Sequence, residues 1–145
     1  MVDSVLMGMA SAAVLLGGSF VVLWLGRASA RGSLGRNHSV GLRTRWTLAS
    51  DRAWDAGHRA GAQRVRVAGL GGVIGAVATV ASGFLPVAGA SENLTNGVIT
   101  AGILGSSVWL VAWVLAAGMA ANRAARAVSE RTVSERTATP HSDRT

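Results

Sequence analysis

Three long runs without a charged residue dominate this chain. Residues 5–25, 67–90 and 93–122 contain 21, 24 and 30 consecutive uncharged residues, most of them apolar. A helix needs about 20 apolar residues to cross the hydrocarbon core of a bilayer, and an open strand there would leave its backbone groups unpaired. We therefore predict an all-α fold, a three-helix transmembrane bundle with spans at about residues 4–26, 67–88 and 95–121.

The charged residues are concentrated on one side of this predicted bundle. They make up only 14% of the 145 residues, and the loop between spans one and two, residues 27–66, contains nine Arg but only two Asp. The turn between spans two and three contains Glu92 alone, whereas Arg123 and Arg126 follow span three. Because positively charged segments stay in the cytoplasm, we expect a multi-pass cell-membrane protein with its N-terminus outside and its C-terminus cytoplasmic.

The chain has room for a single membrane domain, residues 1–126, in which residues 27–66 form a polar loop. The remainder, residues 127–145, is rich in Ser, Thr, Arg and Glu and has no apolar face with which to dock. Such segments cannot bury enough apolar surface to order themselves. We expect a frayed extension of span three followed by disorder, and we assign residues 127–145 to a disordered cytoplasmic tail.

Several functions are disfavoured by what the chain lacks. The spans contain no ionisable residue, and proton relays and ion-coupled transporters need such groups within the membrane. There is no Cys, and His38 and His58 have no further ligands in a metal-binding spacing. Ser50, Asp51 and Asp55 lie near His58 but match no known catalytic triad. We predict no catalytic residue, metal or cofactor, and a structural hydrogen bond for His58.

Nucleic-acid binding is the usual explanation for a strongly basic chain, and this one carries 14 Arg and a formal net charge of +7. Here, however, the loop arginines lie next to predicted spans and have no aromatic platform on which bases could stack. The membrane lipid is a better partner, because Arg near an anionic surface contributes about 1 kcal/mol each before screening. We predict lipid contact and no nucleic acid.

Small residues recur at four-residue spacing in all three predicted spans. Such stripes permit close approach of helix backbones, which drives helix association in lipid. The stripes are Ala13 and Gly17, Gly71 and Gly75, and Gly97, Ala101 and Gly105. They can pack the three helices together or support a homo-oligomer, and the sequence leaves both arrangements open.

The polar loop contains a second predicted helix. Thr47 or Ser50 is a suitable N-cap, and the helix would continue to about residue 60. Trp54 and His58 share one face at a spacing of four residues, with Arg residues on the other side. This pattern predicts a short amphipathic helix lying on the inner leaflet with Trp54 toward the membrane.

Eleven loop residues at fixed spacing carry a family resemblance. They are Asn37, Gly41, Leu42, Arg43, Thr44, Thr47, Ser50, Trp54, His58, Arg59 and Gly61. Together they resemble the signature of the SdpI family, and the likeness extends over the two following spans. It implies a small bacterial membrane protein with a role in immunity to a secreted toxin, coupled to signalling. The chain departs from the family at Arg45, where Pro is frequent, and in lacking the extra N-terminal membrane region of longer members.

Arg43 is the signature residue best suited to hold a ligand. Its guanidinium, next to the hydroxyls of Thr44 and Thr47, could bind a phosphate or carboxylate with two parallel hydrogen bonds. Alternatively, Arg43 pairs with Asp51 or Asp55 inside the loop. Both interpretations are compatible with the sequence.

The leading hypothesis is a non-enzymatic membrane protein that acts in toxin immunity or membrane-linked signalling. Its partners would then be a secreted peptide toxin or a cytoplasmic regulator. A structural subunit of a membrane complex is the second hypothesis, and an enzyme acting on lipid headgroups is a third. Because the signature lies on the predicted cytoplasmic side, protection from an external toxin would have to act through the spans, on an inserted toxin, or through a cytoplasmic partner.

Overall fold

The computed structural model describes residues 2–37 and 39–138. It consists of three long helices, α1 (Val2–Arg31), α2 (Asp51–Ser82) and α3 (Glu92–Ala138), with a short 3-10 helix, η1 (Leu85–Ala88), between α2 and α3. Each of the three long helices is long and apolar enough to cross a membrane, and this described part of the chain contains no strand. The predicted all-α, three-span architecture is confirmed.

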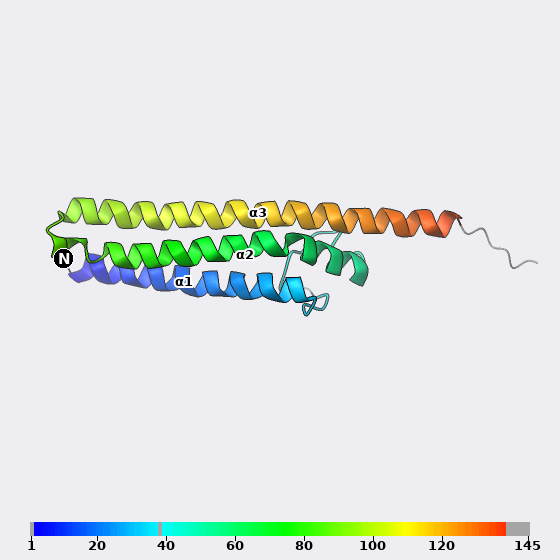
Figure 1. Cartoon of the computed structure of the whole chain (residues 1–145), viewed down its shortest axis with the longest axis horizontal. Coiled ribbons are helices and arrows are strands. Elements are labelled where there is room, and N and C mark those ends of the chain that lie inside the picture. The colour runs from blue at the N-terminus through cyan, green and yellow to red at the C-terminus, as the bar shows by residue number, and fades with distance from the viewer. Residues whose placement is uncertain (1, 38, 139–145) are drawn as a thin grey trace, which may run out of the picture.

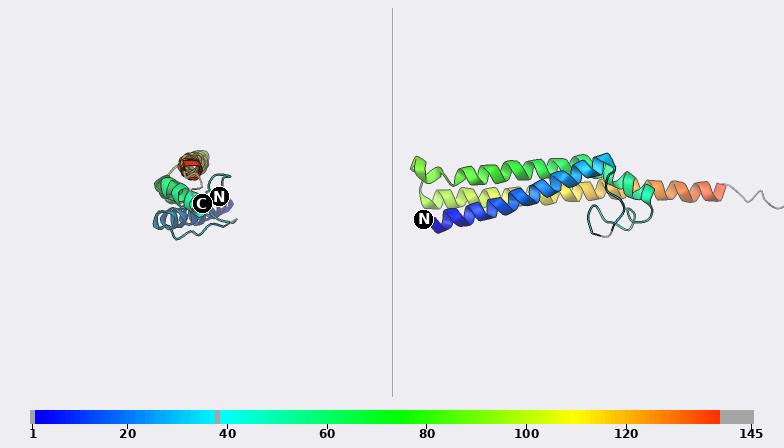
Figure 2. Two further views of the ribbon diagram at one scale, coloured as in Figure 1. Left: turned by 90° about the vertical axis from the view of Figure 1, so that its right-hand side faces the viewer. Right: turned by 90° about the horizontal axis from the view of Figure 1, so that it is seen from below.

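Helix α2 is the central element of the bundle. It packs along both α1 and α3, whereas α1 and α3 touch each other only slightly. Figures 1 and 2 show the three helices side by side, with η1 turning the chain back at the end where the N-terminus lies. The structure therefore depends on two helix–helix contacts, both made by α2.

Glycines on two faces of α2 permit these contacts. A Cβ added to Gly69 would lie 2.7 Å from the side chain of Leu23 on α1, and one added to Gly72 would collide with Ser19. On the other face, Gly71 and Gly75 would collide in the same way with Trp109 and Ser106 of α3. With little hydrophobic drive between helices in lipid, such close packing supplies the attraction.

The small-residue stripes predicted on α1 and α3 do not lie at the helix–helix contacts. Gly17, Gly97 and Gly105 have no atom within 4 Å of an added Cβ, and Ala13 and Ala101 are exposed. Only the predicted stripe on span two, Gly71 and Gly75, packs helices within the chain. The other two stripes lie on the outside of the bundle, among the exposed large apolar side chains.

The short amphipathic helix predicted to end near residue 60 is instead the first part of α2. The helix begins after the N-cap Ser50, whose hydroxyl accepts a hydrogen bond from the Ala53 N–H, and it continues to Ser82 without a break. Trp54 faces the protein rather than the membrane, because its ring is only 1% exposed. The apolar face of this segment is covered by the chain's own loop, so it needs no lipid.

The disordered tail predicted from residue 127 is wrong for residues 127–138, which belong to α3. Figure 1 shows this end of α3 extending well beyond the other helices. Its helical form is supported locally by the pair of Arg126 and Glu130, 2.7 Å apart and one turn from each other. No Pro lies between Glu92 and Ala138 that would end the helix. Residues 139–145 lie outside the described part of the chain.

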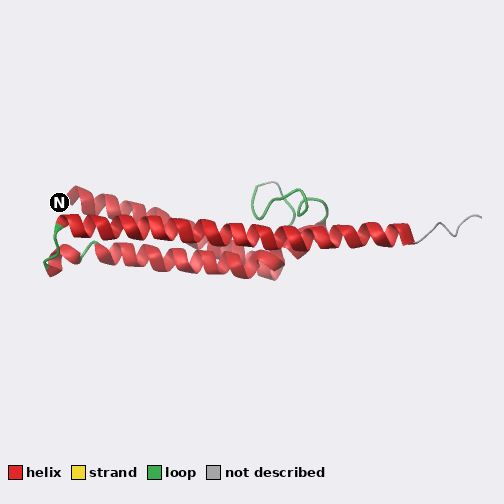
Figure 3. Cartoon of the chain, turned by 90° about the horizontal axis from the view of Figure 1, so that it is seen from above, coloured by secondary structure: helices red, strands yellow, loops and turns green. Residues whose placement is uncertain are grey.

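The connection between α1 and α2 folds against one side of the bundle. Figure 3 shows this loop, in green, on one side of the helices and away from the end where the N-terminus lies. It leaves α1 through Gly32, which has a φ of +67° that favours glycine. The loop thereby brings the signature residues into contact with α2 and α3 just beyond the apolar part of the bundle.

We predict that Gly57→Ala destabilises the bundle by about 1–3 kcal/mol, as overpacking of a tight contact does. The new Cβ would lie 2.8 Å from the Thr47 methyl group and 3.2 Å from the Ala121 carbonyl oxygen. Gly105→Ala is the matched control, because it adds the same methyl group to a helix in open space. Thermal unfolding of both variants in detergent checks this prediction, and equal melting temperatures would contradict it.

Candidate functional site

A buried aromatic pair on α2 forms the centre of the signature region. Trp54 and His58 are 1% and 2% exposed, and their rings stack with centroids 4.0 Å apart. Their spacing of four residues places them on the same face of the helix. Since the loop covers this face, the pair is an attachment point for the loop.

Three hydrogen bonds connect this pair to backbone groups. The indole Nε1–H of Trp54 donates to the Leu34 carbonyl oxygen at 2.6 Å. The Leu42 N–H donates to His58 Nε2 at 3.0 Å, and His58 Nδ1 lies 2.9 Å from the Trp54 carbonyl oxygen. The loop is therefore held at two points along its length, near its start and near its middle.

This arrangement requires neutral histidine. Because Nε2 accepts from an N–H, the ring proton must be on Nδ1, where it donates to the Trp54 carbonyl oxygen. His58 precedes the apolar stretch of α2 that begins at Val67. Burial lowers the pKa of His58 below its ordinary 6.5, an effect that outweighs the opposite influences of the Trp54 carbonyl and of Asp55. The structural hydrogen bond predicted for His58 is present, as both acceptor and donor.

Gly41 is required at its position for two reasons. Its φ of +114° lies in a region that residues with a side chain rarely adopt. A Cβ there would also collide with His58 Nε2 and lie 3.3 Å from the Trp54 ring. The loop backbone can therefore approach the aromatic pair only through a glycine.

The two threonines of the signature build a tight turn. The Thr47 hydroxyl donates to the Leu42 carbonyl oxygen at 2.8 Å and accepts from the Thr44 N–H, also at 2.8 Å. The Thr44 hydroxyl accepts from the Thr47 N–H at 3.2 Å. Thr47 is fully buried, and its methyl group faces Gly57. The hydroxyl of Thr47 is thus committed to the fold and is not directed toward a ligand at the surface.

Asn37 shapes the loop before Gly41. Its side-chain oxygen accepts from the N–H groups of Ser39 and Val40, at 2.9 and 2.7 Å. Its amide nitrogen donates to the Gly35 carbonyl oxygen at 2.9 Å. Such local bonds from Asn stabilise turns, and here they orient the chain toward the aromatic pair.

Gly61 and Gly57 allow both the loop and α3 to pack closely against this part of α2. A Cβ on Gly61 would lie 2.6 Å from the Leu42 side chain and 3.1 Å from the Ala117 carbonyl oxygen. On α3, Ala117, Ala121 and Ala125 form a fully buried stripe. Gly61 belongs to the site predicted from the sequence, whereas Gly57 and this alanine stripe do not, although the four-residue spacing of the alanines was an available signal.

Arg43 is exposed and, unlike most of the signature residues, takes no part in holding the loop. Among the described residues, Arg43 forms no ion pair. Asp51 pairs with Arg36 at 2.8 Å, and Asp55 lies 3.8 Å from Arg59. The proposed pairing of Arg43 with either Asp is therefore not present, and Arg43 retains its charge at the surface.

Arg43 lies at the edge of a groove between the loop and α3. The cavity has a volume of about 770 Å³, with apolar side chains of α3, Leu115 and Met119, along one side. Arg45 and Arg126 also line it, and their guanidinium carbons lie 4.7 and 5.6 Å from the centre of the Trp46 ring. The groove combines positive charge with apolar surface, which suits an amphipathic anionic partner. We name it the Arg43 groove.

Ionisable groups in the described residues form no cluster of three or more that could hold a metal ion. Every buried side-chain nitrogen and oxygen in this described part has a hydrogen-bond partner. Thus the interior of the signature region contains no polar atom awaiting a ligand. Of the sequence-predicted site residues, Asn37, Gly41, Thr44, Thr47, Ser50, Trp54, His58 and Gly61 build the loop and its contacts, whereas Arg43 and Arg59 are exposed.

We predict that Gly41→Ala lowers the stability of the loop's contact with α2 by about 1–3 kcal/mol. The substitution combines a strained backbone with a collision at His58. The control is Gly35→Ala, which lies in the same loop but has nothing within 4 Å of an added Cβ and no positive φ. Trypsin should cleave after Arg43 and Arg45 faster in the Gly41 variant than in the control. Equal cleavage rates would show that the loop does not depend on this contact.

One comparison with known proteins gives a match. The model of the SdpI/YfhL protein family matches residues 33–122, which include the whole signature loop, α2 and most of α3. No curated protein and no solved structure matches the chain. The matched region contains every residue that holds the loop on α2, so the family model and the hydrogen-bonded cluster coincide. With three helices able to cross a membrane, this chain is a multi-pass membrane protein that belongs to the SdpI/YfhL family.

Proposed function

We propose that this protein acts without catalysis, in immunity to a membrane-active peptide or in membrane-linked signalling, and that the Arg43 groove is its recognition surface. Family membership supports the general assignment. The observation that carries the specific proposal is that the signature residues have two different roles. Most signature residues fix the loop, and Arg43 is exposed along a groove that combines positive charge with apolar surface.

The chemistry of the signature supports a binding role over an enzymatic one. A general base needs a free ring nitrogen within reach of a substrate. Both ring nitrogens of His58 are engaged with the protein, and the Thr47 hydroxyl is engaged as well. A planar guanidinium at the rim instead suits recognition of a carboxylate or phosphate by two parallel hydrogen bonds.

The orientation that we propose places the loop and the C-terminus in the cytoplasm and the N-terminus outside. The support is the charge asymmetry, with nine Arg in residues 27–66 against Glu92 alone in the opposite turn. In this orientation the Arg43 groove opens at the inner surface of the membrane. Its occupant would be a peptide toxin that has already inserted, or a cytoplasmic regulator that receives the signal.

A role as a subunit of a membrane complex is the alternative, and one observation favours it. Gly97, Ala101 and Gly105 form an exposed stripe on α3, and open space surrounds both glycines. In lipid such a stripe would permit close packing of another membrane helix. This alternative predicts that the chain is lost or degraded when its partner is absent, whereas an immunity protein should be stable alone.

The orientation is tested by cysteine labelling, because the natural chain contains no Cys. We predict that Ser39→Cys, an exposed loop position, reacts with a membrane-impermeant thiol reagent only after the cells are opened. Asn93→Cys, an exposed position in the first turn of α3 at the opposite end of the bundle, is the control and should react in intact cells. Labelling of Ser39→Cys in intact cells would reverse the proposed topology.

The recognition role is tested by the tolerance of cells to a secreted membrane-active peptide from the same bacterium. Expression of the chain should raise tolerance, and Arg43→Ala should lower it by about tenfold, as expected for the loss of a charge-assisted pair. Arg123→Ala, which removes an exposed Arg outside the groove, should have little effect. Membrane levels of all variants are measured in parallel by immunoblot.

Arg43→Lys separates two roles of the residue. Lys keeps the positive charge but lacks the planar fork of the guanidinium. If the Lys variant restores full tolerance, Arg43 acts only as a point charge near headgroups, and the bidentate recognition model fails. If neither the natural chain nor any variant changes tolerance, the complex-subunit alternative replaces immunity.

A further inference from the structure

A second groove lies between α1 and α2, away from the signature loop's contact with α3. The cavity has a volume of about 560 Å³. Its basic residues are Arg27, Arg59 and Arg66, and its apolar residues include Leu23, Val67 and Leu70. The proposed function above makes no use of this groove. It is separate from the Arg43 groove and shares no lining residue with it.

The side chain of Arg66 is positioned by a close contact with α1. A Cβ added to Gly26 would lie 2.7 Å from Arg66 Cγ and 3.0 Å from its backbone nitrogen. The Arg66 side chain therefore passes close to α1 only because residue 26 is a glycine. The guanidinium of Arg59 lies near Gly32, just after α1, at an ordinary van der Waals distance of 3.7 Å from a Cβ built there.

The groove has an excess of positive charge. Asp55, 3.8 Å from Arg59, supplies one carboxylate. In the described part of the chain, Arg27 and Arg66 have no ion-pair partner. Two positive charges at the rim thus remain without a carboxylate. Such charges repel each other, so an anion placed between them would be stabilised.

The position of the groove along the helices is as informative as its charge. Arg27 follows the first uncharged run closely, and Arg66 directly precedes the second. Both guanidinium groups therefore belong at the boundary where the hydrocarbon core ends. Leu23, Val67 and Leu70 lie on or toward the apolar side of that boundary, and Leu70 is 55% exposed. The groove passes from a basic end to an apolar end across the membrane interface.

We propose that this groove binds one anionic phospholipid. The phosphate would be held by Arg27 and Arg66, with Arg59 close by, and an acyl chain would lie along Leu23, Val67 and Leu70. Guanidinium groups bind phosphate with short, charge-assisted and often paired hydrogen bonds. The order of basic and apolar groups along the groove matches the order of headgroup and chain in a phospholipid. Occupation would stabilise the contact between α1 and α2, because the ligand touches both helices.

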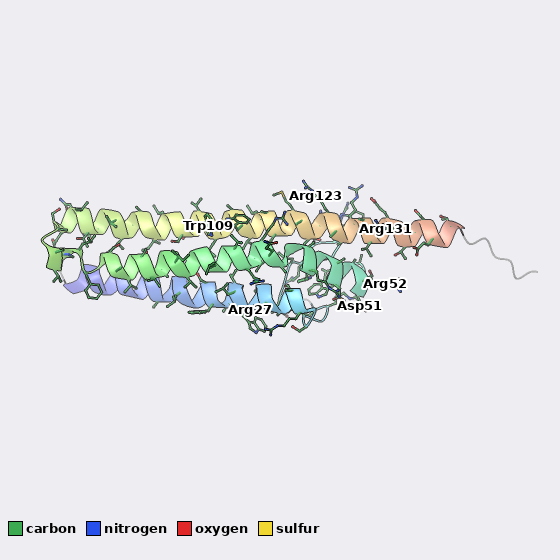
Figure 4. All side chains as sticks on the ribbon, in the orientation of Figure 1. Arg27, Asp51, Arg52, Trp109, Arg123 and Arg131 are labelled. Atoms are coloured by element: carbon green, nitrogen blue, oxygen red, sulfur yellow. The ribbon has the colours of Figure 1, made fainter. Side chains whose placement is uncertain are left out.

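The test uses the purified full chain in a neutral detergent, with phosphatidylglycerol or phosphatidylcholine added. Native mass spectrometry counts bound lipid, and thermal unfolding measures stabilisation. The double variant R27Q/R66Q should bind phosphatidylglycerol about tenfold more weakly than the natural chain, because both paired contacts are lost. The control R64Q/R123Q removes the same charge from residues outside the groove and should bind like the natural chain. In Figure 4, Arg27 lies on α1 and Arg123 on α3, at opposite edges of the bundle.

Further measurements distinguish a phospholipid site from a general phosphate site and from non-specific electrostatic attraction. Glycerol phosphate, which has the headgroup chemistry without acyl chains, should not stabilise the protein. If it stabilises as well as phosphatidylglycerol does, the lipid assignment is overturned. If both double variants lose binding equally, the attraction is a diffuse effect of net charge, which also overturns the site. If the natural chain binds phosphatidylcholine as tightly as phosphatidylglycerol, the proposed anionic-lipid site is also overturned.

Circular dichroism establishes that each variant is folded before binding is measured. If R27Q/R66Q does not fold, R27K/R66K replaces it, because it keeps the charges and loses the planar forks. Weaker binding of phosphatidylglycerol to the Lys variant supports the site, and natural affinity overturns it. Toxin tolerance is a separate readout, since the Arg43 groove does not include either residue.

Discussion

The close approach of α2 to its neighbours is the constraint on which the rest of this structure depends. Helix α2 is in extensive contact with both other long helices, while α1 and α3 barely meet. In a bilayer, apolar side chains gain little by leaving lipid for protein, so association depends on contact distance. Glycines at positions 69, 71, 72 and 75 let side chains of α1 and α3 lie directly against the α2 backbone. Larger residues there would separate the helices.

Close approach at glycine also holds the polar end of the molecule together, where the loop packs against α2 in addition to α3. Gly57 and Gly61 place the α3 backbone and the loop side chains Thr47 and Leu42 against α2. Trp54 and His58, one turn apart, then secure the loop by hydrogen bonds to backbone groups. Each such bond contributes about 1 kcal/mol on balance. Their larger effect is to fix one path for a loop that has no regular secondary structure.

This organisation explains how a short loop can present a rigid surface at a membrane. The polar groups that would otherwise let the loop move are paired within it, as with Asn37 and Thr47. Arginines that take no part in holding the loop are exposed on both sides of α2. Arg43 belongs to the groove against α3, and Arg66 to the groove against α1. Taken together, our two proposals assign an anionic partner to the groove against α3 and an anionic phospholipid to the groove against α1.

The sequence by itself determined the class of fold and the position of the signature. Uncharged runs of 21, 24 and 30 residues permit few structures other than membrane-spanning helices, because backbone groups cannot go unpaired in lipid. The fixed spacing of the loop residues also indicated the family, and residue type gave Thr47 and Ser50 as the N-cap candidates. These features depend on local periodicity and length, which a linear chain displays directly.

Only the tertiary structure decided what the signature residues do. The pattern of Trp54 and His58 was compatible with a helix on the membrane surface, and the same face is instead covered by a loop that folds back over it. Thr47 resembled a ligand-binding hydroxyl until its bond to the Leu42 carbonyl was known. Residues 127–138 were expected to be a frayed helix end followed by disorder, because composition does not reveal how far an existing helix continues without a break. Periodicity shows which face of a helix is special, but the partner of that face is set by contacts between residues distant in sequence.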